Sequence, residues 1–295
     1  MKPIPKSAIE GISWPAVLPP EAATCLAVMY QLAQTQWWSP EQLRHYQFHQ
    51  INRLLRHTVK TAAFYRDRLG DLGIDAQTEI TPELFSQIPL LRREDIQNHL
   101  KEMTSTSTPS SHGKVGVSKS SGSTGRPIQI YATSVSQLFW MAFSLRDHLW
   151  HQRDFSKKHA EIRAGAKTRD IPQWGAAVST IFPTGPSAIL NIKESIETQI
   201  QWVQNTRPAY LLSYPSNLRD MAQRCIEADI RFPGLEEIRT LGETVPDDLR
   251  ALCRQAWNVD IKDMYSSMEI GYMALQCPGH DHYHIMSEGI MVEIL

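Results

Sequence analysis

The chain has 295 residues, of which 42% are hydrophobic, and carries 30 Lys and Arg against 31 Asp and Glu, so it can bury a large core in one globular unit or two smaller ones. The nearly neutral charge without a basic block argues against nucleic acid as a partner, and no run approaches the ~20 apolar residues of a membrane span. The four cysteines lie far apart and form no CxxC pair, which fits a reduced chain better than a disulfide framework; they are Cys25, Cys225, Cys253 and Cys277. The protein is therefore expected to be soluble and cytoplasmic, with no membrane partner.

Residues 1–103 are expected to form a mainly helical part of the molecule. Between Pro40 and Leu69 apolar residues recur at three- and four-residue steps, which predicts an amphipathic helix. Ser39 followed by Pro40 marks its start. Further helices are expected near Thr81 and in the stretch "LLRREDIQNHL".

Residues 104–295 are expected to form an α/β core. After a stretch rich in Ser, Thr, Gly and Pro, short strand-like runs such as "RPIQIYA" and "PAYLLSY" alternate with helical ones such as "SNLRDMAQRCIEA" and "PDDLRALCRQAW". That alternation predicts β-sheets flanked by helices.

The stretch "SKSSGSTGRPIQIYAT", Ser118 to Thr133, has two interpretations. Its composition fits a solvated linker. Strand-like runs on both sides instead indicate a loop fixed at both ends, whose glycines and hydroxyls could bind a polyphosphate. It is not a Walker loop, because Gly125-Arg126-Pro127 leads into a strand rather than a helix.

Two later segments also have purely structural interpretations. "LGETVPDDL", Leu241 to Leu249, predicts a strand end, a turn and a helix that begins near Pro246 and two aspartates. Ser266 to Glu269 has the S-x-x-E spacing of a helix capping box.

The cluster "CPGHDHYH" contains four competent zinc ligands at short spacing, Cys277, His280, His282 and His284. Alternate histidines on an extended segment are expected to point to opposite faces, so that not all can converge. Zinc is therefore not expected as a cofactor.

Several stretches together resemble the adenylate-forming enzymes, the acyl-CoA synthetase superfamily, and within it the phenylacetate–CoA ligase-like branch. The similarity spans nearly the whole chain. In chain order the stretches are "LPPEAATCLAVMYQLAQTQWWSPEQL", "FSQIPLLRREDI", "SSGSTGRP", "WVQNTRPAYLLSYPSNLRDMA", "IRTLGETVPDDL", "DMYSSMEIGYMALQC" and "HYHIMSEGIMVEIL".

The resemblance implies roles for named residues. Glu269 matches the catalytic acid that holds Mg²⁺, Tyr265 matches the aromatic residue against adenine, and Trp174 to Pro186 resembles the region lining the acyl pocket. The remaining implied nucleotide contacts are Ser120, Ser121, Gly122, Ser123, Thr124 and Gly125 at the triphosphate, Gly242, Glu243 and Thr244 beside the adenine pocket, and Ser266 and Ser267.

The sequence also departs from the wider superfamily. Ile128 stands where many relatives have a lysine, Ser266 stands for a glycine and Met268 for a threonine. The hydroxyl expected near the α-phosphate is then missing or supplied by Ser267, and triphosphate charge must be met by metal and neutral donors.

The resemblance implies an AMP-forming acid–CoA ligase that uses ATP, Mg²⁺ and coenzyme A with a small carboxylic acid. The chain stops before the family's ribose-binding aspartate and the small C-terminal domain with its lysine, so it is expected to be the large N-terminal domain only, weakly active or inactive alone. The alternatives are adenylation for amide or ester biosynthesis, and a non-catalytic nucleotide- or partner-binding module.

Overall fold

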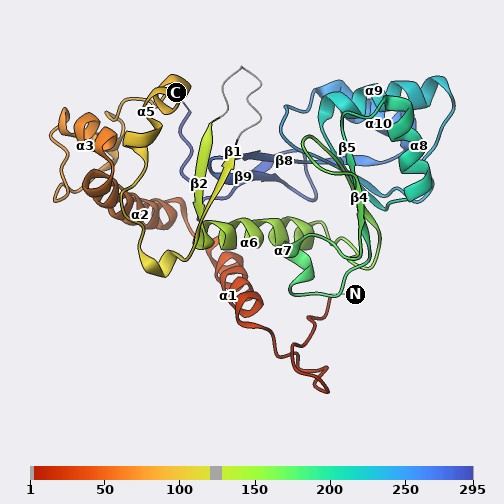
Figure 1. Ribbon diagram of the computed structural model, residues 1–295, viewed down its shortest axis with the longest axis horizontal. Helices are drawn as coiled ribbons and strands as arrows, with labels where there is room; N and C mark the ends of the chain where they lie inside the picture. Colours follow the sequence, from red (N-terminus) through yellow and green to blue (C-terminus); the bar gives the residue numbers. More distant parts are fainter. Residues whose placement is uncertain (1–2, 120–127, 295) are drawn as a thin grey trace. The chain divides into compact units, whose positions relative to one another are not determined.

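The computed structural model describes residues 3–119 and 128–294, which form two compact units. The sheet unit comprises residues 1–29 and 140–286, and the helical unit comprises residues 30–139 and 287–295. Two of the three boundaries fall within helices, α1 (Pro20–Thr35) and α6 (Ser134–Trp150) (Figure 1), and the third lies between Met286 and Ser287. Within the described residues, no helix is both long and apolar enough to cross a membrane.

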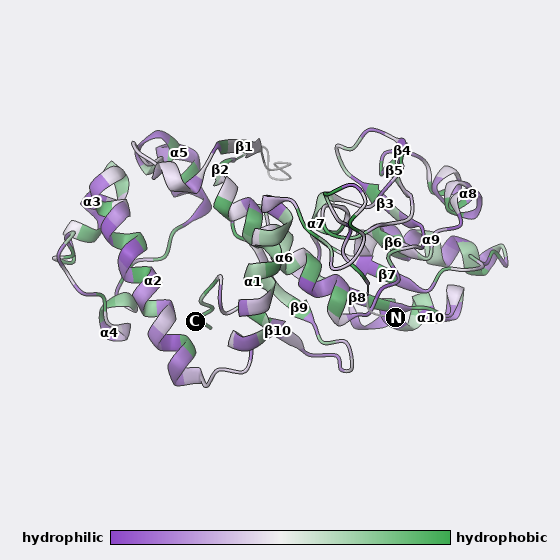
Figure 2. Ribbon diagram, turned by 90° about the horizontal axis from the view of Figure 1, so that it is seen from below, coloured by the Kyte–Doolittle hydropathy of each residue, from purple (hydrophilic) through white to green (hydrophobic). Residues whose placement is uncertain are grey.

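The helical unit is organised around α2 (Pro40–Thr61). Its predicted start is confirmed, because Ser39 Oγ accepts from Gln42 N at 3.3 Å while Gln42 Oε1 accepts from Ser39 N at 3.1 Å. Hydrophobic and hydrophilic residues alternate along α2 (Figure 2), as expected of a helix with one buried face. The other elements are α3 (Ala63–Gly70), α4 (Pro82–Phe85), α5 (Arg93–Met103), the 3₁₀ turn η1 (Ser110–His112), β1 (Val115–Lys119) and β2 (Gln129–Thr133).

The single helix predicted from Pro40 to Leu69 is wrong in one respect, since the chain breaks at Ala62. That residue is extended, with φ −128° and ψ 114°, and its side chain is buried. The break lets α3 turn and pack Leu69 beside Val59 of α2 in one apolar cluster. Tertiary packing thus overrides a continuous helical pattern.

The sheet unit is built on eight strands in the order β10-β9-β8-β7-β6-β3-β5-β4. The pairs that β3 makes with β5 and β6, and that β7 makes with β6 and β8, are parallel, whereas β4, β9 and β10 pair antiparallel. The strands are β3 (His159–Arg163), β4 (Arg169–Ile171), β5 (Ser187–Asn191), β6 (Tyr210–Ser213), β7 (Glu237–Thr240), β8 (Asp260–Ser267), β9 (Gly271–Gln276) and β10 (Tyr283–Ile285). The predicted α/β class is confirmed.

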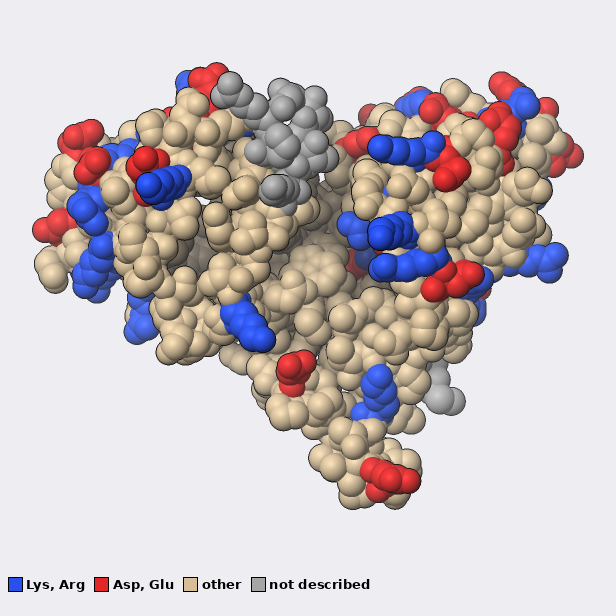
Figure 3. Space-filling view, in the orientation of Figure 1, with Lys and Arg blue, Asp and Glu red and all other residues tan. Residues whose placement is uncertain are grey.

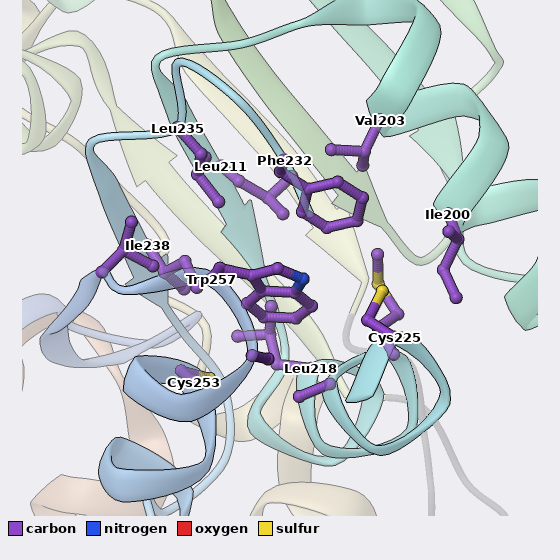
Figure 4. Packing of buried hydrophobic residues seen from close by; sticks show 14 of the residues in the cluster. Ile200, Val203, Leu211, Leu218, Cys225, Phe232, Leu235, Ile238, Cys253 and Trp257 are labelled. Carbon is purple, nitrogen blue, oxygen red and sulfur yellow. The ribbon is translucent and has the colours of Figure 1, made fainter. Parts of the chain in front are cut away.

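Helices connect the parallel strands and supply most of the apolar core. They are α7 (Ala176–Ser179), α8 (Ile196–Thr206), α9 (Pro215–Glu227) and α10 (Asp247–Trp257). Side chains from α8, α9 and α10 converge on residues of the sheet (Figure 4), where Phe232 stacks on Trp257 with ring centroids 5.1 Å apart. On the surface, acidic and basic side chains are intermixed on each unit (Figure 3).

A buried ion network links α6 to β7 inside the sheet unit. Asp147 Oδ2 lies 2.7 Å from Arg153 Nη1 and 2.8 Å from Arg239 Nη2, and Arg153 Nε lies 2.5 Å from Glu237 Oε1. Burial alone would raise the pKa of Asp147, but the two guanidiniums outweigh it and hold that pKa below its usual value. Burial prevails at Glu237, whose pKa is raised despite Arg153. Asp147 is therefore the principal counterion.

Replacing this counterion should destabilise the sheet unit. Asp147→Asn keeps the side-chain shape but leaves two buried guanidiniums without their shared charge, so the free energy of unfolding should fall by about 3–5 kcal/mol. Urea denaturation measures the change. As a control, Asp248→Asn removes an exposed partner of Arg219 and should have a much smaller effect. Equal effects of the two substitutions would contradict the role of Asp147.

Three histidines in or near the network should make stability fall with acid. Burial, followed by the nearby arginines, lowers the pKa of His148 and His159 well below 6.5 and that of His151 to about 4. Between pH 6.5 and 4 the unfolded chain binds protons that the folded chain excludes, so stability decreases as pH falls, by up to ~1.4 kcal/mol per pH unit for each histidine. Denaturation across this range should show a smaller slope for His151→Gln and an unchanged slope for the exposed His112→Gln. A flat profile would contradict burial of the neutral histidines.

Candidate functional site

Predicted site residues follow two neighbouring parallel strands of the sheet unit. Gly242 to Thr244 come directly after β7, and Tyr265 to Ser267 form the end of β8. Thr240 pairs with Asp263, so Gly242 and Tyr265 each lie two residues beyond this pair. They share the carboxyl edge of the parallel strands, the edge at which open α/β sheets bind ligands.

The backbone at Gly242 requires glycine. Its φ is +74°, and a Cβ at this position would lie 3.2 Å from the Tyr214 ring. The Tyr214 hydroxyl accepts from Ala164 N at 3.3 Å, which joins the segments that follow β6 and β3. Sequence reasoning missed Tyr214, although an aromatic residue at the end of the predicted strand "PAYLLSY" was a signal.

Glu243 binds the first turn of helix α9. Its carboxylate accepts from Ser216 N at 2.8 Å and from Ser216 Oγ at 2.9 Å. A negative charge at this position satisfies a free backbone donor and complements the positive end of the helix dipole. Glu243 therefore has a structural role, and the edge beside β7 is fixed to α9.

Tyr265 lies at a distortion in the β8–β9 pair. Tyr265 pairs with Ala274 but Ser266 pairs with Tyr272, so one residue of β9 is bulged out. Bulges bend a strand and redirect its side chains, and they are frequent next to active sites. The Tyr265 side chain is 60% exposed, which leaves its ring open to a planar ligand.

The helix capping box predicted as an alternative for Ser266 to Glu269 is wrong, because this segment is a strand end and a hairpin turn. Ser266 and Ser267 pair with β9, and Ser267 Oγ accepts from Ile270 N at 3.2 Å across the turn. The antiparallel pairing occupies backbone groups that a helix would need. Glu269 is exposed on the turn, with no hydrogen bond or ion pair to any residue that the structure describes.

A buried carboxylate supports this edge from within the sheet. Asp263 accepts from Thr240 Oγ1 at 2.5 Å and from the Tyr283 hydroxyl at 2.6 Å, and its backbone N donates to Gln276 Oε1 at 2.9 Å. Burial and the Asp263 contact raise the pKa of Tyr283. The Asp263 side chain thus contacts β7 and β10 and its backbone contacts β9, and no local sequence pattern indicated this role.

The predicted phosphate loop, Ser120, Ser121, Gly122, Ser123, Thr124 and Gly125, lies outside the described residues, as do Arg126 and Pro127. The strands predicted on its two sides are confirmed. β1 and β2 pair antiparallel over five positions, with Lys119 opposite Gln129. The loop therefore connects two strands of one hairpin and does not tether separate domains.

The segment from Trp174 to Pro186 contributes mainly to the core. Trp174 is buried, donates from Nε1 to Lys157 O at 2.8 Å and packs edge-on against Tyr210 with ring centroids 5.5 Å apart. Ile181 and Phe182 are also buried. Its largest side chains fill the interior. This placement argues against a direct contact between Trp174 and an acyl group.

Three of the four predicted zinc ligands converge, so the expectation that alternate histidines point to opposite faces is wrong. One ligand atom from each of Cys277, His282 and His284 lies within 4.8 Å of the others. Residues two apart on an extended strand point to the same face, so His282 and His284 are on one side of β10. His280 stacks on His282 at 5.4 Å but is not part of this cluster.

Comparisons with solved structures identify the fold. The chain is similar to 2-hydroxyisobutyryl-CoA ligase with 2-HIB-AMP and CoA in the thioesterification state, with a TM-score of 0.61 and 16% identity over 83% of this chain and 54% of the ligase. The open conformation of that ligase gives a TM-score of 0.59 and 16% identity over 78% and 55% of the two chains. The postadenylation state gives 0.57 and 15% over 79% and 50%.

These matches confirm the expected fold of an adenylate-forming enzyme. The chain spans about half the length of the ligase structures that it matches. No protein-family model and no curated protein matches the sequence.

The contact of Glu243 with α9 leads to a test of its structural role. Glu243→Gln should lower the free energy of unfolding by about 0.5–1 kcal/mol, because the cap loses its charge and part of its hydrogen bonding. Ser216→Ala removes one donor, and the double variant should cost less than the sum of the two single variants. Denaturation of all four proteins measures this coupling. Additive costs would show that the two residues do not act together.

Proposed function

We propose that the chain is the nucleotide- and acyl-binding part of an AMP-forming carboxylate ligase. The observation that carries the proposal is the shared carboxyl edge of β7 and β8, where the residues that resemble an adenylate site come together. The fold supports it, because the similar ligase structures contain an acyl-AMP and CoA. Of the acids open to such an enzyme, we propose a small carboxylic acid as the substrate.

The reaction would proceed in two steps. A carboxylate oxygen of the acid attacks the α-phosphorus of ATP, the bond from that phosphorus to the bridging oxygen breaks, and pyrophosphate leaves. The thiol sulfur of CoA then attacks the acyl carbon, and AMP leaves with the electrons of the acyl–oxygen bond. Positioning and charge neutralisation supply most of the rate enhancement in such transfers.

Tyr265 would hold the adenine base. Its ring is largely exposed, and Gly242, two residues after the neighbouring strand β7, has no side chain to obstruct a flat ligand. Stacking of a base on an aromatic ring contributes ~1–3 kcal/mol. Glu243 and Thr244 would form the wall beside the base, with Glu243 held in place by Ser216.

Glu269 would hold Mg²⁺ beside the phosphates. Mg²⁺ commonly binds one or two carboxylates together with phosphate oxygens and water, and Glu269 is an exposed carboxylate with no partner in the described parts of the chain. When bound, the ion would neutralise phosphate charge and polarise the oxygens around the α-phosphorus. Ser266 and Ser267 would offer hydroxyls on the same turn.

The loop from Ser120 to Gly125 would contact the triphosphate, since its hydroxyls and glycine backbone provide neutral donors. Ile128 stands where many relatives have a phosphate-binding lysine, and its side chain is only 4% exposed. No lysine at this position would then contact the phosphates. The matching stretches along the chain, together with Ile128, lead us to propose the phenylacetate–CoA ligase-like branch. CoA is the proposed acceptor.

Substitution of Glu269 tests the metal role. Glu269→Gln should raise the Kd for Mg-ATP about tenfold or more, while the free energy of unfolding stays unchanged, because the exposed side chain makes no fold contact. Calorimetric titration with and without Mg²⁺ measures the affinity. The matched control is Glu227→Gln, at the far end of α9 from the proposed site, and it should bind like the unmodified chain. Unchanged Mg-ATP affinity in Glu269→Gln would rule out the metal role.

A further inference from the structure

The turn between β9 and β10 brings together three groups that the proposed ligase chemistry does not use. Cys277 follows β9, His282 precedes β10 and His284 lies within it. One ligand atom from each lies within 4.8 Å of the other two. Cysteine sulfur and histidine nitrogen are typical zinc ligands in proteins.

The hairpin backbone explains why these side chains meet. Tyr283 pairs with Gln276, and Cys277 N donates to His282 O at 2.9 Å, so Cys277 is directly opposite His282. Opposite residues of an antiparallel pair have Cβ atoms about 5 Å apart on one face. His284 is two residues further along the same face and reaches Cys277 diagonally.

The rings are also held from outside the hairpin. Trp150 of α6 packs edge-on against His284 with ring centroids 5.4 Å apart, and His282 contacts His284 at 4.9 Å. These contacts restrict ring rotation and keep both imidazoles beside the thiol. Contacts that fix the orientation of metal ligands raise the affinity for the metal.

Cys277 differs from the other three thiols of the chain. Cys25, Cys225 and Cys253 are buried, whereas Cys277 is partly exposed, and the two histidines beside it are exposed. A metal ion can therefore reach the cluster from solvent. In a tetrahedral zinc site, the ordinary zinc–nitrogen and zinc–sulfur bond lengths place neighbouring ligand atoms about 3.3–3.8 Å apart. Small side-chain rotations would therefore bring the three ligand atoms to binding distance.

We propose that Cys277, His282 and His284 bind one Zn²⁺, with water as the fourth ligand. The bound ion would fasten β10 to the end of β9. Tyr283, between the two histidines, points to the opposite face and donates to Asp263 of β8, whose carboxylate also contacts β7. The zinc site would therefore stabilise the contacts of Asp263 and, through them, the carboxyl edge of the sheet. The zinc proposal does not depend on the proposed ligase activity.

Zinc titration of the chain tests the site. Metal-free protein, prepared with a chelator, is titrated with Zn²⁺ against a chromophoric competitor, and native mass spectrometry gives the stoichiometry. One Zn²⁺ per chain is expected, and Cys277→Ser or His282→Gln should weaken binding at least about 10- to 100-fold, since even loss of an outer-shell partner costs that much. His280→Gln, two residues from the nearest ligand, is the matched control and should bind zinc unchanged. Equal binding by Cys277→Ser, or equal loss in His280→Gln, would overturn the ligand set.

A second measurement needs no variant. Co²⁺ in place of Zn²⁺ should give a thiolate-to-metal charge-transfer band, and Zn²⁺ should slow alkylation of Cys277 in peptide mapping. No charge-transfer band together with unchanged alkylation at saturating metal would overturn the proposal even if a variant failed to fold.

Discussion

The sheet unit depends on one buried carboxylate that neutralises two buried guanidiniums. Asp147 in α6 contacts Arg153 and Arg239, and Arg153 also contacts Glu237 at the start of β7. Isolated charges in such an interior would be costly, so α6 and β7 can be buried together only when these partners meet. The position of β7 in the sheet is thereby tied to α6, and with it the strand end that carries Gly242.

Around this anchored strand, the carboxyl edge combines rigid support with exposed side chains. Asp263 fixes β7, β8 and β10 by hydrogen bonds, and Glu243 fixes the segment after β7 to α9. Tyr265 and Glu269 remain exposed on β8 and its turn. Sites that must position a ligand need this combination, because binding groups are effective only when their neighbours hold them in place.

Local patterns in the sequence were sufficient for the α/β class, for the capped start of α2 and for the strands around the serine-rich loop, because these features depend on residues close together in the chain. The break at Ala62 depends on how Leu69 packs against Val59. The capping box at Ser266 was wrong because pairing with β9 competes for the same backbone groups. The contacts of Asp147 and Asp263 join residues up to 92 positions apart, and no local pattern encodes them. The convergence of His282 with His284 was missed for a different reason, since the period of a strand places alternate residues on the same face.

The central claim is that the carboxyl edge of β7 and β8 binds the adenine nucleotide. Hydrogen–deuterium exchange of the chain with and without saturating Mg-ATP, resolved by peptide, tests it most directly. The account predicts slower exchange in residues 241–245 and 264–270, together with the loop at 120–125, and little change at the opposite end of the sheet. Protection confined to other segments, or none at saturating nucleotide, would contradict it.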